Sequence, residues 1–193
     1  MPEPTFEELI EAMKDAVGVL QGADIPFVLG GGLSAWARGG PRSEHDVDFL
    51  VRSEDIDSAL AAFEAEGWET ARPPEGWLVK AWHRNGALVD LIYDPASGPI
   101  TDAVIERAPL TEVMSVRVHV STLEDVMVSK LMAITEQEPD FGPLLEWTRA
   151  LREQIDWDEV RARSEASPFA RAFFTLVEGL GIVERSEEEA RPG

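Results

Sequence analysis

The spacing of apolar residues predicts an amphipathic helix over residues 5–21. Apolar side chains recur there at intervals that place them on one helical face: Phe6, Leu9, Ile10, Met13, Val17 and Leu20. Thr5 and Glu8 have the spacing of a capping box, which satisfies free backbone N–H groups at a helix start. One side of this helix should therefore pack on a core.

Short apolar runs bounded by glycine, proline or polar residues predict the strands that follow. The expected strands cover residues 25–29, 46–51, 68–72, 77–83, 87–93, 110–113 and 116–120. Asn85-Gly86 favours a tight hairpin between two of them, because this dipeptide adopts positive φ readily. Helical spacing recurs over 33–38, between Ser53 and Gly67, and near 100–107.

The pattern changes near residue 122, after which only helical spacing remains. Thr122 and Asp125 resemble a second capping box. Helices are expected over 123–136, 141–153, 156–165 and 168–180. The chain should therefore be an α+β protein, with an α/β domain over 1–120, a C-terminal helical region over 121–183 and a charged, flexible tail over 184–193.

The net charge indicates which class of partner the protein can bind. There are 17 lysines and arginines against 37 aspartates and glutamates, which gives a net charge of −20. Such a surface repels nucleic acid unless a local basic stripe exists, and the arginines here are scattered among acids. A small cationic molecule or a protein fits this field better than RNA. Acidity that serves only solubility, or a saline habitat, would give the same number.

Composition also limits the compartment and the ligand types. The chain has no cysteine, which excludes disulfides and thiolate metal sites. No apolar run approaches the roughly 20 residues of a membrane span, and the first residues do not resemble a signal peptide. We expect a cytoplasmic protein without a membrane partner. Nothing in the sequence indicates an oligomeric state.

Two carboxylates stand two residues apart on the predicted strand 46–51. Side chains alternate along a strand, so Asp46 and Asp48 leave the same face. Carboxylates this close repel each other in a low-dielectric setting, and a bound divalent cation removes the repulsion. Hard oxygen ligands without cysteine favour Mg²⁺. The simpler alternative is a strand end at which both acids face water.

Asp90 interrupts an otherwise apolar strand that runs from Ala87 to Tyr93. A charge in a buried strand must be paired or must coordinate a metal. If this strand lies beside the 46–51 strand, three carboxylates converge, which is the arrangement that two-metal nucleotidyl transfer needs. The alternatives are that Asp90 faces solvent or pairs with Lys80 across the hairpin.

Three glycines, Gly30-Gly31-Gly32, separate the strand 25–29 from the helix 33–38. Glycines let the backbone approach phosphates, and the free N–H groups of a helix start hold anionic oxygens. Ser34 could add a hydroxyl to such a site. The stretch is neither a Walker loop nor a dinucleotide fingerprint, and ordinary turns use glycines too.

The order of these features resembles the nucleotidyltransferase superfamily with the DNA polymerase β-like fold: a glycine turn, a short helix, Asp46-Val47-Asp48 on the next strand, and a later carboxylate. Within it, this stretch is similar to minimal bacterial enzymes that adenylylate aminoglycosides and lincosamides. Residues 120–125, 130–133 and Asp140 also resemble the helical part of that group and of AbiEii-type toxin nucleotidyltransferases. The resemblance covers about residues 25–145. It implies a small mixed β-sheet with flanking helices, followed by a helical bundle.

The resemblance also implies roles for individual residues. Asp46 and Asp48 would be metal ligands, and Asp90 would be the third ligand or the base that deprotonates the acceptor hydroxyl. The residues implied to contact the nucleotide phosphates are Gly31, Gly32, Ser34 and Lys130. Read only as a residue on an apolar helix face, Lys130 could simply extend to solvent.

The expected activity is Mg²⁺-dependent transfer of a nucleoside monophosphate from an NTP, with ATP as the expected donor, to a hydroxyl of an acceptor. The net charge favours a small cationic acceptor of antibiotic type. One alternative is a toxin-type nucleotidyltransferase that acts on tRNA or on a protein. Another is a catalytically silent fold relative that serves as an interaction module, although the intact set of three aspartates argues against it.

Trp77 and Trp82 flank the hairpin and could stack on a base or sugar, or pack in the core.

Overall fold

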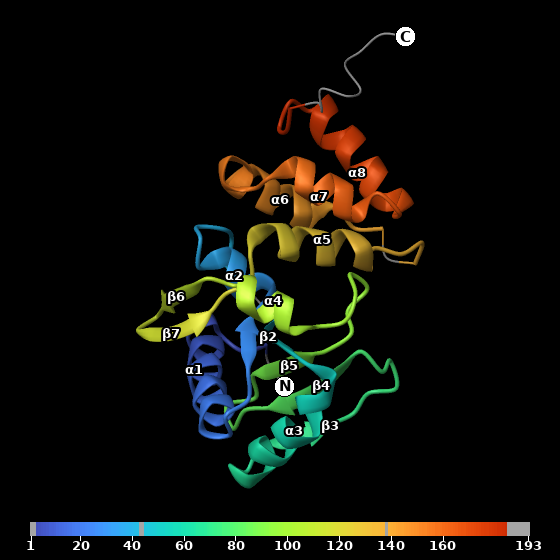
Figure 1. The fold of residues 1–193 in the computed structure, drawn as a ribbon. Coiled ribbons are helices and arrows are strands. Elements are labelled where there is room, and N and C mark those ends of the chain that lie inside the picture. Colours follow the sequence, from blue (N-terminus) through green and yellow to red (C-terminus); the bar gives the residue numbers. More distant parts are fainter. Residues whose placement is uncertain (1–2, 43–44, 138, 185–193) are drawn as a thin grey trace.

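The computed structural model describes residues 3–42, 45–137 and 139–184 (Figure 1). It confirms the α+β class, with a mixed sheet, flanking helices and a group of C-terminal helices. All of the expected tail except Glu184 lies outside the described residues. Within the described ranges, no helix combines the length and the apolar character that crossing a membrane requires.

The central sheet has the strand order β1-β2-β5-β4-β3. Its members are β1 (Phe27–Leu29), β2 (Asp46–Val51), β5 (Leu88–Ile92), β4 (Leu78–Trp82) and β3 (Glu69–Ala71). β2 and β5 run parallel, and the other neighbouring pairs run antiparallel. The predicted hairpin between β4 and β5 is present, and Gly86 has a φ of 91° in its turn.

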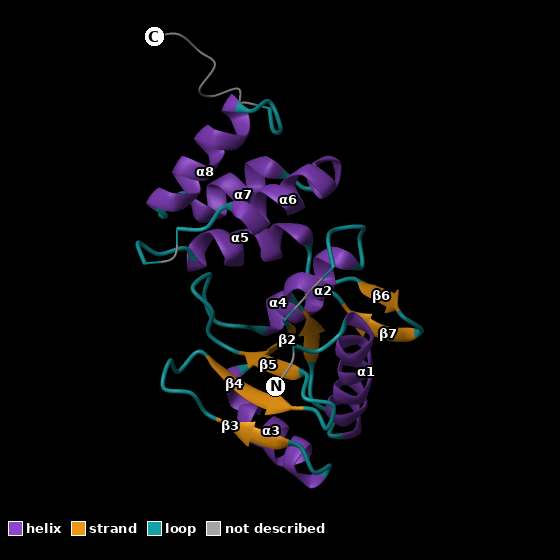
Figure 2. Ribbon diagram, turned by 180° about the vertical axis from the view of Figure 1, so that it is seen from behind, coloured by secondary structure: helices purple, strands orange, loops and turns teal. Residues whose placement is uncertain are grey.

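Side-chain alternation along β2 and β5 separates a core face from an open face. The residues on the core face are fully buried: Val47, Phe49, Val89 and Leu91. Helices α1 (Phe6–Gly22) and α3 (Ile56–Ala65) cover this face (Figures 1 and 2). The alternate residues line a cleft on the open face: Asp46, Asp48, Leu50, Asp90 and Ile92. The period-two pattern thus places all three predicted acids on one side.

The first helix begins at the predicted capping box. The Thr5 hydroxyl accepts the backbone N–H of Glu8 at 3.3 Å, and the Glu8 carboxylate accepts the N–H of Thr5 at 2.7 Å. Seven apolar residues of α1 are buried against the sheet side, which is the helical face that the spacing predicted.

Shorter elements connect the sheet to the helical part. They are α2 (Gly31–Trp36), the 3₁₀ turn η1 (Ser53–Asp55), α4 (Asp102–Arg107), β6 (Leu110–Val113) and β7 (Val116–His119). α2 begins at Gly31, two residues before the predicted start, because two of the three glycines form its first turn. β6 and β7 form a separate hairpin, and Val120 then makes a parallel bridge with Leu29 at the edge of the main sheet.

The C-terminal helices surround a second apolar cluster. They are α5 (Leu123–Ala133), α6 (Gly142–Leu151), the 3₁₀ turn η2 (Arg152–Gln154), α7 (Trp157–Ser164) and α8 (Pro168–Gly179). α5 contacts α7 and α8 on this side and α2 on the other, so it lies between the two halves (Figure 1). Ala35 of α2 belongs to the second cluster, and a domain boundary near residue 120 stays a prediction.

Candidate active site

The three predicted aspartates lie together on the open face of the sheet. Asp48 and Asp90 are partners in the parallel register of β2 and β5, and Asp46 is on the same face of β2. One carboxylate oxygen from each residue lies within 4.8 Å of the other two. Asp48 and Asp90 are buried and Asp46 is half-buried. The strand of Asp90 therefore does lie beside that of Asp46 and Asp48, and Asp90 does not face solvent.

The glycine turn packs directly against this cluster. The N–H of Gly30 donates to the Asp48 carbonyl at 2.8 Å, which holds the turn beside β2. Gly31 has a φ of 52°, a left-handed conformation that favours glycine. A Cβ at Gly31 would lie 1.6 Å from Oδ2 of Asp48. This approach is possible only because position 31 carries no side chain.

The electrostatic setting disfavours negative charge on the buried acids. Burial, followed by the charges of Asp46 and Asp90, raises the pKa of Asp48 to about 7, even though the charges of Lys130 and Lys80 oppose the rise. The pKa of Asp90 is also raised, by burial first, although the hydrogen bonds and charge of Lys80 oppose this. A bound cation would favour the ionised forms of both carboxyls.

Lys80 pairs with Asp90 from the neighbouring strand. Its Nζ lies 3.0 Å from Oδ1 and 3.2 Å from Oδ2 of Asp90. The two residues face each other in the register of β4 and β5. The ion pair that the sequence left as an alternative is therefore present together with the acid cluster, not instead of it.

The donor set fits a hard divalent cation such as Mg²⁺. Every ligand atom in the cluster is a carboxylate oxygen, and the oxygens are close enough to share an ion. The pKa of Asp48 is raised because burial and the neighbouring acids disfavour its ionised form, and a divalent cation would compensate for both effects. The residues that would hold the ion are Asp46, Asp48 and Asp90.

The acids form one wall of a cleft of about 520 Å³. Segment 94–100 and residues of α4, α5 and α7 form the rest of the lining. Lys130 of α5 lines the cleft and is exposed, with its Nζ 5.9 Å from the centroid of the Trp147 ring. Its charge acts on Asp48, so the lysine predicted to approach phosphates and the predicted metal ligands face the same space.

The cleft does not include every residue predicted to contact phosphate. Gly31 lines it, whereas Gly32 and Ser34 do not. Ser34 is fully buried, and its hydroxyl donates to the Gly31 carbonyl at 2.7 Å. Ser34 thus supports the glycine turn from inside. A contact of Gly32 or Ser34 with a triphosphate stays a prediction.

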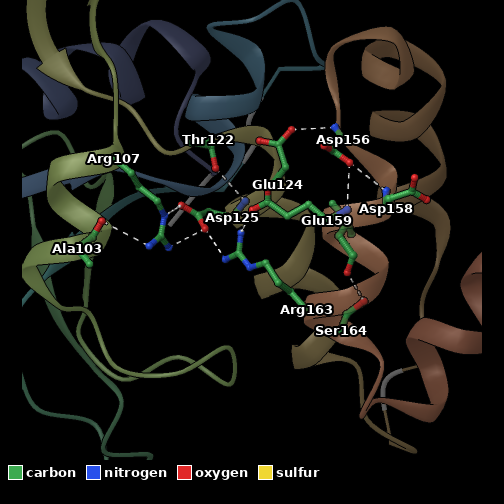
Figure 3. Close-up of polar contacts among 11 residues, drawn as sticks. Ala103, Arg107, Thr122, Glu124, Asp125, Asp156, Asp158, Glu159, Arg163 and Ser164 are labelled. Carbon is green, nitrogen blue, oxygen red and sulfur yellow. Dashed lines mark hydrogen bonds and ion pairs between the residues drawn. The ribbon is translucent and has the colours of Figure 1, made fainter.

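A charge cluster around the buried carboxylate of Asp125 on the far wall was missed from the sequence. Asp125 of α5 accepts hydrogen bonds from Nε and Nη2 of Arg107 at 2.9 and 2.8 Å, and a further one from Arg163 of α7 (Figure 3). Burial alone would raise the pKa of Asp125, but the hydrogen bonds and charges of both arginines outweigh it, so this pKa is lowered. All three residues line the cleft. The hydroxyl of Thr122 does accept the N–H of Asp125 at 3.1 Å, so the capping signal concealed the second role of this carboxylate.

Trp77 and Asp94 are joined through their backbones on another part of the cleft lining. The Trp77 carbonyl accepts the N–H groups of Tyr93 and Asp94 at 3.0 and 3.2 Å. Trp77 is 39% exposed, Asp94 is exposed, and both line the cleft. Trp82 is half-buried and does not line it. Of the two tryptophans considered for stacking, Trp77 is the one in position.

Comparisons with known proteins agree with this geometry. The family described as nucleotidyl transferase of unknown function (DUF2204) matches residues 9–172. No protein of curated function matches the chain by sequence. The fold is similar to ANT(2'')-Ia in complex with adenylyl-2''-tobramycin, with a TM-score of 0.58 and 14% identity over 86% of this chain and 97% of that one. It is also similar to the lincomycin-bound lincosamide antibiotic adenylyltransferase LnuA, with a TM-score of 0.53 and 11% identity over 79% of this chain and 99% of that one.

Proposed function

Because this chain belongs to the family of nucleotidyl transferases of unknown function (DUF2204), we propose that it transfers a nucleoside monophosphate from an NTP, with ATP as the expected donor, to a hydroxyl of a small acceptor. The observation that carries the proposal is the convergence of Asp46, Asp48 and Asp90 beside the glycine turn in one cleft. Those are the parts that nucleotidyl transfer requires: carboxylates for cations and a close backbone approach for phosphates.

In the proposed reaction, the acceptor oxygen forms a bond to the α-phosphorus of the NTP. The bond from this phosphorus to the oxygen that bridges to the β-phosphate breaks, and pyrophosphate leaves. Mg²⁺ held by Asp46, Asp48 and Asp90 would neutralise charge on the phosphoryl oxygens. The chain itself supplies orientation, because the glycine turn and the two strands hold the reactants in a fixed arrangement.

Asp90 is the proposed acceptor of the hydroxyl proton. Lys80 lies within 3.2 Å of both its carboxylate oxygens and so favours the ionised form, which is the form that can take a proton. Each carboxylate oxygen has more than one lone pair, so the contact with Lys80 leaves room for a further hydrogen bond.

The opposite wall supports the proposed binding of the triphosphate. Lys130 faces the same cleft as the acids and offers a mobile positive charge. Gly31 brings backbone into contact with the acid cluster without a side chain between them. A phosphate chain that leaves the acid cluster would thus lie between the glycine turn and Lys130.

The proposed acceptor is a small cationic molecule with a hydroxyl group. Trp77 and Asp94 support this, because an exposed ring and a carboxylate in the same cleft suit a ligand that has an apolar face and a positive charge. The net charge of −20 disfavours nucleic acid. ANT(2'')-Ia and LnuA, which share the fold, were solved with an adenylylated aminoglycoside and with a lincosamide.

Calorimetry with ATP, GTP, CTP and UTP, each with and without Mg²⁺, tests the donor half of the proposal. We expect Mg²⁺-dependent binding of at least one NTP, and its loss in Asp48→Asn. Asp102→Asn, at an exposed residue of α4 outside the cleft, is the matched control and should bind as the wild type does. No Mg²⁺-dependent binding to the wild type at millimolar nucleotide would contradict the proposal. A screen of hydroxylated cationic acceptors with labelled NTP then identifies the second substrate.

A further inference from the structure

The hydroxyl of Ser121 is a buried polar group without a hydrogen-bond partner among the described residues. Ser121 is 2% exposed and lines the cleft. A buried hydroxyl without a partner destabilises a protein, and most such groups in native structures have one. Within the described part of the chain the other unpartnered buried side-chain atom is Nε of Arg161, which does not line the cleft. The Ser121 hydroxyl can therefore donate a hydrogen bond to a ligand in the cleft.

The backbone places Ser121 next to the glycine turn. The N–H of Ser121 donates to the Leu29 carbonyl at 2.9 Å, and Leu29 immediately precedes Gly30. The N–H of Gly30 in turn donates to the Asp48 carbonyl on the other side of β1. The start of the glycine turn is thus flanked by Asp48 on one strand and by Ser121 on the opposite edge.

The helical side of the cleft, which begins at Ser121 and α5, carries cations, whereas the sheet side carries the acid cluster. Arg107, Lys130 and Arg163 all line the part of the cleft formed by α4, α5 and α7. Asp125 pairs with Arg107 and Arg163, and Arg163 also pairs with Glu159, so these four charges cancel and Lys130 supplies the net positive charge. Ser121 also directly precedes Thr122, the N-cap of α5, and the N-terminal end of an eleven-residue helix favours negative charge.

We propose that the Ser121 hydroxyl donates a hydrogen bond to the β- or γ-phosphate of the nucleotide, in an anion subsite formed with Lys130, Arg107 and Arg163. This inference rests on the proposed function, and it adds a phosphate contact outside the glycine turn. Repulsion decides the direction of the phosphate chain: the reacting α-phosphate belongs at the acid cluster, and the leaving pyrophosphate is drawn away from the acids toward the cations.

Ser121→Ala separates this role from a merely structural one. The substitution removes the hydroxyl and leaves the volume nearly unchanged. Because the hydroxyl has no partner within the described residues, the thermal midpoint of the ligand-free variant should equal or exceed that of the wild type. A hydrogen bond to a charged group is among the stronger ones, so we expect the affinity for ATP and for inorganic pyrophosphate, each with Mg²⁺, to fall about tenfold or more. Affinity for AMP, which lacks the β- and γ-phosphates, should stay at the wild-type value.

Ser164→Ala is the matched control. Ser164 is also a fully buried serine, but its hydroxyl donates to the Val160 carbonyl at 2.7 Å and it does not line the cleft. This variant should lose stability and keep its nucleotide affinity, which is the reverse of the pattern expected for Ser121→Ala.

Calorimetry on the full chain with ATP, pyrophosphate and AMP distinguishes the outcomes. If the wild type binds ATP and Ser121→Ala binds ATP and pyrophosphate with wild-type affinity, the subsite is overturned and the proposed function stays intact. An equal loss of affinity for AMP would also overturn it, because the hydroxyl would then contact another part of the nucleotide. Failure of the wild type to bind any NTP with Mg²⁺ would overturn both proposals.

Discussion

The backbone of Gly31 rests directly on the carboxylate of Asp48, at a distance that leaves no room for a methyl group. The glycine turn and the acid cluster are thus in direct contact. A ligand phosphate on the turn and a cation on Asp48 would be held in one arrangement, which is the positioning that a transfer reaction needs.

Gly31→Ala should strongly reduce activity and weaken the fold locally. The new Cβ would displace the Asp48 carboxylate, and a left-handed conformation costs a non-glycine residue about 1–2 kcal/mol. We expect transfer activity to fall by about 100-fold or more, as a misplacement of about 1 Å can do. Gly18→Ala is the control, because Gly18 is exposed in α1 and a methyl group at this position would have no neighbouring atom within 4 Å. It should raise stability by about 0.5–1 kcal/mol and leave activity unchanged. Wild-type activity in Gly31→Ala would contradict the contact.

Asp48→Asn should make the ligand-free protein more stable near neutral pH. The pKa of Asp48 in the folded state is about 7, well above the value of about 4 in an unfolded chain. The folded state therefore binds this proton more tightly, so its contribution to stability is present below about pH 4 and is lost as the pH rises to about 7. Urea unfolding in EDTA should show the difference between Asp48→Asn and wild type growing from pH 5 to pH 8, by at least about 1 kcal/mol. A constant difference over this range would show that Asp48 titrates normally.

Lys80→Met should move the acidic limb of the pH–activity profile to higher pH. Lys80 is the group that lowers the pKa of Asp90, and without it burial and Asp46 would raise that pKa further. The proposed base would then be protonated at pH values where the wild type is active. The pH dependence of kcat/KM measures the shift. Lys14→Met, at an exposed residue of α1, should leave the profile unchanged. An unchanged limb in Lys80→Met would assign the base to another group.

Asp125→Asn should destabilise the protein at pH 7, with an effect that disappears in acid. Asp125 is buried and joins α4, α5 and α7 through Arg107 and Arg163, although Arg107 is partly exposed and its share is screened. We expect a loss of about 1–3 kcal/mol. Folding lowers the pKa of Asp125, whereas it raises the pKa of Asp48. The contribution of Asp125 to stability is therefore present above about pH 4 and is lost as the pH falls through the folded-state pKa.

The control for this prediction is Asp102→Asn, which removes an exposed ion pair with Arg52. Its effect in the same urea titration should stay below about 1 kcal/mol at every pH. If Asp125→Asn were no more destabilising than Asp102→Asn, the contacts of Asp125 with the two arginines would not stabilise the packing of the helices.

The acid cluster could be predicted because its signals are local and strong. The two-residue spacing of Asp46 and Asp48 gives one face of a strand, and Asp90 is conspicuous as a charge among apolar residues. The sequence could not show that β2 and β5 are neighbours, because strand pairing across some forty residues leaves no periodic trace. The resemblance supplied that step, and the register of Asp48 with Asp90 confirmed the pairing.

The features that were missed depend on contacts between distant elements. Thr122 and Asp125 fit a helix cap, and nothing near them in sequence indicates arginines arriving from α4 and α7. Ser121 is one serine before a helix, a common position, and only its lack of a partner among the described residues distinguishes it. The Ser34 hydroxyl, for which the resemblance implied a phosphate contact, donates to the Gly31 carbonyl, and its contact with phosphate stays a prediction.

The parallel pairing of β2 and β5 also bears on how the protein folds. Parallel strands cannot be joined by a tight turn. In the sequence, α3, β3 and β4 separate β2 from β5, so Asp48 and Asp90 meet through a long-range pairing. Such long-range pairing is slow to form, and here it also brings two like charges together. A cation that binds both strands in the folded state, and not the unfolded chain, would offset this repulsion and raise the free energy of unfolding. The proposed metal site would then hold the sheet together as well as serve the reaction.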